Sequence, residues 1–323
     1  MVSLPVAISL YVSLSYVVAL HISFKGINDY KMRRDDPRVI KSRMKRVLGV
    51  TLINIVLIPW FHAIYSQGEC NFIEAFLRLG LIPGILYGQG ILRFAWGLFF
   101  SSVVNCLKLM CILYCGPLLD NLLYYLLVPG VSVKSMFIDV YNELFNIWGL
   151  RNYVFAPLTE ELFYTAMIIN NYLITDQKST TFNSVIFLSP LFFGVAHVHH
   201  GFEMYSIGLY STLNILFSVL FQTVYTTAFG IFTNYVFVRT GGNLWCCIFL
   251  HAMANYLGFP GGSELSSQLH IVQHKCSRLV IVFGALWKWI YIGLLLVGVA
   301  EFKNNLWNLT QSPYELRITR SAQ

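Results

Sequence analysis

Long apolar runs recur along the whole chain and limit the folds open to it. A membrane span needs about 20 mostly apolar residues. The candidate spans are residues 2–22, 48–65, 79–100, 107–128, 153–174, 183–198, 205–238, 243–259 and 279–299. The sixth run is short, and the seventh is long enough to hold two pieces. Only 11% of the 323 residues are charged, whereas soluble domains carry about 25%.

These runs predict an all-α fold, a polytopic membrane bundle of about eight transmembrane helices. No repeat, low-complexity segment or linker divides the chain, so we expect one domain over residues 1–323. The glycines and prolines among the early runs are expected to pack and kink membrane helices.

Positive charge is concentrated after the first apolar run. Residues 25–46 contain nine Lys or Arg against three Asp. Short loops rich in Lys and Arg stay in the cytosol, so we expect this loop to be cytosolic and the N-terminus to face the opposite side. The alternative is a contact with anionic headgroups or with a basic substrate tail. No soluble domain carries the patch, so nucleic-acid binding is not expected.

Two adjacent carboxylates, Glu160 and Glu161, interrupt the run 153–174, which carries no other charge. A carboxylate at the centre of a bilayer costs about 2.5–3.5 kcal/mol. We therefore expect at least one of them to face a wet cavity lined by protein and to have a partner there. Adjacent residues on a helix point about 100° apart, so the two carboxylates should have different roles.

Three histidines lie at the end of a later apolar run. His197 follows Phe193 by four residues, so a helix would place both on one face. His199 and His200 come directly after it. We expect His197 to be a partner of the glutamates, whereas His199 and His200 are more typical of polar residues at the membrane interface.

A second pair of polar residues lies in the run 243–259. His251 and Asn255 are four residues apart, so a helix presents both on one face. Two donors fixed in a dry site can stabilise an oxyanion. The alternative is a hydrogen-bonded pair that holds helices together.

Together these motifs resemble those of the type II CAAX prenyl endopeptidases, the Ras-converting family of glutamate-type intramembrane proteases. That family shows Glu-Glu-x-x-x-Arg, Phe-x-x-x-His and His-x-x-x-Asn in this order, and the chain has their counterparts within residues 151–260. The flanking residues Ala-Pro-Leu-Thr and Asn-Tyr-Leu-Gly-Phe-Pro are similar to the eukaryotic branch. One position departs, because Thr165 stands where the family has arginine. This puts a structural role of Glu161 in doubt or gives it another partner.

The resemblance implies a catalytic cavity between helices, in which the last three residues of a prenylated CAAX protein are removed. It assigns roles to five residues: Glu160 as general base, His197 sharing the water, His251 and Asn255 at the oxyanion, and Glu161 in support. The implied partners are the lipid bilayer and farnesylated or geranylgeranylated CAAX proteins, such as Ras-type GTPases. The implied location is the endoplasmic reticulum membrane, crossed several times. No metal and no cofactor are implied.

Three other classes of protein could use the same residue types. A zinc protease would draw its ligands from Glu160, His197, His199 or His200, and His251, but the pattern His-Glu-x-x-His is absent. A cysteine protease would use Cys246 or Cys247, but a thiol in apolar surroundings is inert. A non-enzymatic ion or proton relay needs only titratable groups inside the membrane, and the flanking residues argue against it.

Overall fold

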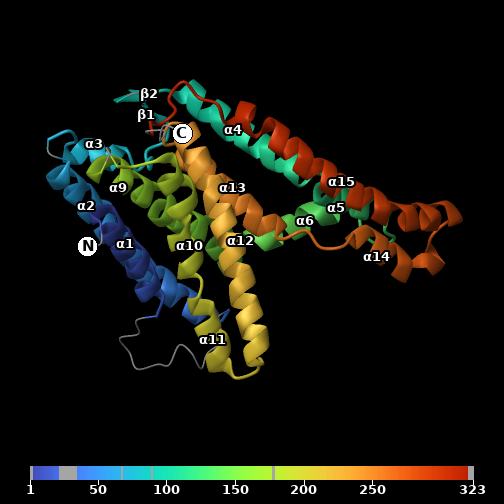
Figure 1. The fold of residues 1–323 in the computed structure, drawn as a ribbon. Coiled ribbons are helices and arrows are strands. Elements are labelled where there is room, and N and C mark those ends of the chain that lie inside the picture. The colour runs from blue at the N-terminus through green and yellow to red at the C-terminus, as the bar shows by residue number, and fades with distance from the viewer. Residues whose placement is uncertain (1–2, 22–34, 67, 89, 177–178, 319–323) are drawn as a thin grey trace.

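The computed structural model describes residues 3–21, 35–66, 68–88, 90–176 and 179–318, and almost all of its regular structure is helical (Figure 1). Within the described ranges, six helical stretches are long and apolar enough to cross a membrane: Leu4–His21, Pro37–Tyr65, Trp96–Leu113, Ser184–Ile207, Thr212–Arg239 and Arg278–Thr310. A further helical stretch, 147–175, is interrupted by π turns. The apolar helix α13 (Leu244–Leu257) is shorter than these six stretches. The fold is therefore the predicted all-α membrane bundle.

The first half of the chain contains α1 (Leu4–His21), α2 (Pro37–Tyr65), α3 (Phe72–Leu77), β1 (Ile85–Gly88), β2 (Ile91–Phe94), α4 (Trp96–Leu113), α5 (Cys115–Leu127) and α6 (Val133–Leu144). The second half contains α7 (Ile147–Gly149), η1 (Leu150–Phe155), α8 (Ala156–Glu160), η2 (Glu161–Met167), α9 (Ile168–Thr175), η3 (Ser184–Leu188), α10 (Pro190–Ala196), α11 (His199–Ile207), α12 (Thr212–Arg239), α13 (Leu244–Leu257), α14 (Glu264–Ile271), η4 (Gln273–Lys275) and α15 (Arg278–Thr310). The elements η1 to η3 are π-helical, and η4 is a 3₁₀ turn.

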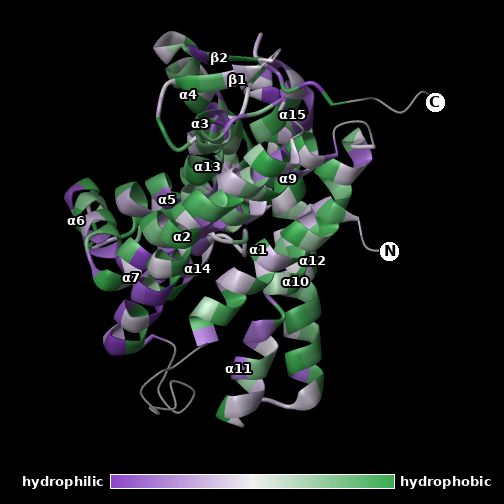
Figure 2. Cartoon of the chain, turned by 90° about the vertical axis from the view of Figure 1, so that its left-hand side faces the viewer, coloured by the Kyte–Doolittle hydropathy of each residue, from purple (hydrophilic) through white to green (hydrophobic). Residues whose placement is uncertain are grey.

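The stretch of η2 and α9 lies at the centre of the bundle. Every residue of η2 is buried, and η2 contacts α1, α10, α12 and α13. Outside this centre, α15 runs beside α4 and α5, and the lower parts of α11 and α12 project together from the bundle (Figure 1). Hydrophobic residues cover most of the long helices, with hydrophilic stretches near α7, α14 and α11 (Figure 2).

The predicted spans 79–100 and 107–128 are wrong in their boundaries. Residues 85–94 form the antiparallel hairpin of β1 and β2, and α4 begins only at Trp96. Gly84 explains part of the difference, because its φ is +82° and a Cβ there would lie 2.9 Å from the Trp96 ring. A residue with a side chain rarely adopts this conformation. This glycine therefore forms a turn, and not the helix kink expected from the sequence.

The long run 205–238 is mostly one helix, although its length suggested two pieces; only residues 205–207 belong to the preceding helix. The helix α11 ends at Ile207, and α12 begins at Thr212. Ser211 caps α12, because its side-chain oxygen accepts a hydrogen bond from the backbone nitrogen of Asn214. With 28 residues, α12 is long enough to cross a bilayer and still extend beyond it.

Candidate active site

A cavity of about 390 Å³ lies between the helices at the centre of the bundle. Its wall takes residues from α1, α2, η1, α8, η2, α10, α11, α12 and α13. Seven of the residues singled out from the sequence line it: Glu160, Phe193, His197, His199, His200, His251 and Asn255. His199 and His200, expected at the membrane interface, therefore belong to the cavity wall. Segments that are distant in the sequence therefore meet around one space.

The two glutamates are placed differently, as their angular separation predicts. Glu160, the last residue of α8, faces the cavity with 18% of its side chain exposed, whereas Glu161, the first residue of η2, is 1% exposed. Oγ1 of Thr165 donates to Oε2 of Glu161 at 2.7 Å, and Nδ1 of His251 lies 2.8 Å from its Oε1. Glu161 thus has partners in the wall, and the threonine that replaces the family arginine is one of them.

His251 connects the two carboxylates. Its Nδ1 contacts Glu161, while its Nε2 lies 3.7 Å from Oε2 of Glu160. This second distance is longer than a hydrogen bond, but one water molecule can contact both atoms. The imidazole also packs edge-on against Phe229 and Phe193. The ring is therefore held on several sides, with Nε2 directed toward Glu160.

His197 is oriented by the first residue of its own motif. It caps the end of α10, and its Nδ1–H donates to the backbone oxygen of Phe193 at 2.9 Å, because a carbonyl can only accept. The rings of the two residues are 5.0 Å apart, and Phe193 stacks on Tyr164. The four-residue spacing thus lets one residue position the imidazole through both its backbone and its ring.

Asn255 lies on the same cavity wall as His251 but has a separate partner. Its Nδ2 donates to the backbone oxygen of Asn152 at 2.9 Å. The predicted pair therefore lies on one helix and lines one cavity, and each side chain has its own partner.

The sequence did not point to two residues of the first two helices that line the cavity, Tyr16 and Arg43. The Tyr16 hydroxyl donates to Oε1 of Glu160 at 3.4 Å and lies 3.1 Å from Oγ1 of Thr159. A tyrosine in an apolar run looks like any core aromatic, and Arg43 is one of many basic residues in its segment. No sequence signal would have separated them from their neighbours.

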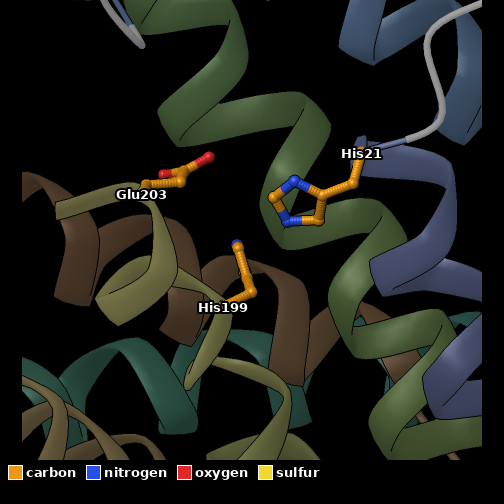
Figure 3. Close-up of side chains that lie close together, drawn as sticks. All are labelled: His21, His199 and Glu203. Atoms are coloured by element: carbon orange, nitrogen blue, oxygen red, sulfur yellow. The ribbon is translucent and has the colours of Figure 1, made fainter. Parts of the chain in front are cut away.

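A further group of polar side chains lies beside the cavity. Among the described residues, His21, His199 and Glu203 bring potential ligand atoms within 4.8 Å of one another. Figure 3 shows the three side chains together, one from α1 and two from α11. Oε1 of Glu203 lies 2.7 Å from Arg43, and its Oε2 lies 3.2 Å from Nδ1 of His200. This group shares only His199 with the zinc ligands suggested by the sequence, and a cation here would compete with a guanidinium.

The cysteines named as alternative nucleophiles lie outside the cavity wall. Cys246 and Cys247 are fully buried on α13, and neither is among the residues that line the cavity. Sγ of Cys247 is directed to the backbone oxygen of Thr233, 3.4 Å away. Their surroundings are those of packed core residues.

Known proteins resemble this chain over most of its length. The family described as "Type II CAAX prenyl endopeptidase Rce1-like" matches residues 142–257, which contain all three motifs. The chain is 39% identical to CAAX prenyl protease 2 of Saccharomyces cerevisiae over 307 residues, which cover 94% of this chain and 95% of that relative. It is 32% identical to the human CAAX prenyl protease 2 over 249 residues, or 76% and 68% of the two chains. No solved structure matches. The chain therefore belongs to the eukaryotic type II CAAX prenyl endopeptidases and is a peptide-bond hydrolase of the membrane.

Proposed function

We propose that this endopeptidase removes the C-terminal tripeptide of prenylated CAAX proteins with a water molecule activated inside its cavity. The observation that carries the proposal is the grouping of Glu160 with His197 and His251 around one cavity between membrane helices. The names of the relatives, CAAX prenyl proteases, supply the class of substrate.

Glu160 is the general base of the proposed reaction. It takes a proton from a water shared with His197, and the water oxygen attacks the carbonyl carbon of the prenylated cysteine residue. The tetrahedral intermediate then collapses, the C–N bond breaks, and the proton returns from Glu160 to the leaving amine. A positioned base of this kind contributes typically 10²–10⁴-fold to the rate.

His251 and Asn255 are proposed to donate hydrogen bonds to the oxyanion. His251 does so from Nε2 when both ring nitrogens carry protons, and Glu161 accepts at Nδ1 and compensates the charge. Asn255 has a second N–H besides the one bonded to Asn152. One such donor is typically worth about 2.7–4 kcal/mol in the transition state. Neither His199 nor His200 carries a step in this scheme.

The proposed substrates are farnesylated or geranylgeranylated proteins with a cytosolic C-terminus, including Ras-type GTPases. The basic segment 25–46 marks the cytosolic side. Arg43 of this segment and Arg151 both line the cavity, so the peptide is expected to enter from that side. We place the enzyme in the endoplasmic reticulum membrane, the location implied by its family.

The test is cleavage of a farnesylated CAAX peptide by the purified protein, with release of the tripeptide followed by mass spectrometry. We expect Glu160→Gln, which keeps the shape and removes the base, to lower the rate at least about 100-fold while the protein still accumulates. Near-normal cleavage by this variant would contradict the proposed mechanism.

A chelator arm of the same experiment separates this mechanism from a zinc protease. We expect activity to survive removal of metal ions, even if the group of His21, His199 and Glu203 binds a cation. Activity that is lost with zinc and restored by its return would favour the zinc protease instead.

A further inference from the structure

Positive charge reaches the cavity from a helix that carries none of the three motifs. Arg43 lies on α2 and lines the cavity together with Glu160 and His251. Among the described lining residues, the side chains with a permanent positive charge are Arg43 and Arg151, and the carboxylate is that of Glu160. A basic group has therefore been brought into the space where the peptide is cut.

Arg43 is fixed in the wall and keeps unused hydrogen-bond donors. Its guanidinium lies 2.7 Å from Oε1 of Glu203, and the two side chains are only 13% and 11% exposed. Its Nε is buried and donates to no partner among the described residues. A guanidinium carries five N–H donors, so a second anion can bind beside Glu203. Figure 3 shows Glu203 and His199 on α11, with His21 of α1 near them.

Arg151 is engaged differently. Its Nη1 lies 2.9 Å from Oδ1 of Asp35, a largely exposed carboxylate, and its Nε donates to Oδ1 of Asn152. Two of its donors are thus directed to neighbours, one of them an exposed carboxylate. Of the two arginines, Arg43 is the one that is buried in the wall with a donor left over.

The proposed substrate carries one anion, its C-terminal carboxylate, close to the bond that is cut. The tripeptide that leaves ends in a free carboxylate, and three extended residues reach about 10 Å. A carboxylate taken out of water without a partner is costly. Arginine binds carboxylates through its planar fork of donors. We propose that Arg43 binds the terminal carboxylate of the substrate, an inference that rests on the proposed function.

This assignment gives the enzyme a way to select its bond. Arg43 and Glu160 line the same cavity, and three extended residues reach about 10 Å. We therefore expect a carboxylate anchored at Arg43 to leave the bond three residues away near Glu160, so that cleavage occurs at a fixed distance from the C-terminus. Glu203 is then a positioning residue, because it holds the guanidinium without contacting the substrate.

The test compares two farnesylated peptides that differ only at their end, a free carboxylate or a carboxamide. We expect the wild type to prefer the carboxylate by at least about tenfold in kcat/KM, equivalent to about 1.4 kcal/mol. Arg43→Gln should cut both peptides at about the rate at which the wild type cuts the amide. Lys45→Gln is the matched control, since Lys45 is an exposed cation of the same helix that does not line the cavity.

Cleavage of the amide also reports whether the variant is folded. If Arg43→Gln does not accumulate, Arg43→Lys replaces it, and the loss of the fork should still lower the ratio of acid to amide cleavage. A ratio that is unchanged in the variant, or no preference in the wild type, overturns the inference. If the wild type cuts neither peptide, it is the proposed function that fails.

An anionic lipid headgroup is the other source of an anion at this position. The same assay in vesicles of phosphatidylcholine, with and without phosphatidylserine, separates the two. If Arg43 holds a headgroup, Arg43→Gln will slow both peptides equally, and only when the anionic lipid is present. That outcome also overturns the assignment to the substrate carboxylate.

Discussion

At the scale of single residues, Thr165 stands where the family has arginine and supplies a hydrogen bond to the buried Glu161. The family arginine would hold the second glutamate by charge. Here a neutral hydroxyl donates to Glu161, and it also lies 3.3 Å from Oγ1 of Thr233. The other partner of Glu161 is His251. The orientation of this histidine therefore depends on a carboxylate that Thr165 helps to hold.

Thr165→Val should destabilise the protein and impair catalysis. Valine has a similar shape but no hydroxyl, so one oxygen of the buried Glu161 loses its donor. A hydrogen bond to a charged group contributes about 1.5–3 kcal/mol. Thermal unfolding in detergent should show this loss, and kcat should fall more than KM rises. Thr165→Ser keeps the hydroxyl and is the control. Unchanged unfolding and kcat in the valine variant would show that the hydrogen bond has no role.

The residues around the cavity differ in how far the sequence could predict them. Glu160 was found as a charge in an otherwise uncharged apolar run, and His197 and His251 were found as polar groups at helical spacing from another motif residue. Tyr16 and Arg43 reach the same cavity only through the packing of α1 and α2 against the centre. Tertiary contacts of this kind leave no periodic pattern in the chain.

At the scale of elements, the contact between α10 and α12 decides where His197 lies. A Cβ at Gly194 would collide with Oγ1 of Thr227 and would lie 2.8 Å from the backbone oxygen of Thr223. The two helices can approach this closely only because the position is glycine. Gly194 is one turn before His197, so the approach of the helices fixes the end of α10.

Gly194→Ala should push α10 away from α12 and displace His197. Overpacking of a filled core typically costs 1–3 kcal/mol, and we expect activity to fall more than stability because the imidazole moves with its helix. Gly49→Ala is the control, since a Cβ on this residue of α2 meets nothing within 4 Å. It should be neutral or stabilising by up to about 1 kcal/mol. Equal activity of the two variants would mean that the close contact does not position His197.

The hairpin of β1 and β2 marks the limit of prediction for whole elements. An apolar run of about 20 residues satisfies the length rule for a span, yet residues 79–100 divide into turns, strands and the start of α4. The signals were the glycines and the proline within that run. We interpreted them as kinks because membrane helices also tolerate such residues. Composition alone does not separate the two outcomes.

At the scale of the whole molecule, the cavity is small for the substrate proposed. Its volume of about 390 Å³ lies near the lower end of the range for small-ligand sites, about 300–1,000 Å³. It must hold a peptide end as well as the reacting water. The prenyl chain is therefore expected to lie outside the polar centre, between helices whose outer faces are apolar (Figure 2).

A prenyl chain in that position should supply much of the binding free energy. Burying about four CH₂ groups at about 0.8 kcal/mol each contributes about 3 kcal/mol, or about 200-fold in kcat/KM. Three short residues and one carboxylate offer few other contacts. We therefore expect the same CAAX peptide without its prenyl group to be cut at least about 100-fold less efficiently, at equal concentration, in detergent and in liposomes.

The comparison in two environments also tests where the lipid binds. In liposomes a prenylated peptide is concentrated in the bilayer, so part of the preference there reflects partition and not contact with the enzyme. In detergent, a matched peptide carrying an unbranched alkyl chain of equal carbon number controls for partition. A preference that persists over this control is due to contacts between the prenyl group and the helices. If the unprenylated peptide is cut as well as the prenylated one in both environments, the chain contributes nothing to recognition, and a catalytic centre placed between membrane helices must serve another kind of substrate.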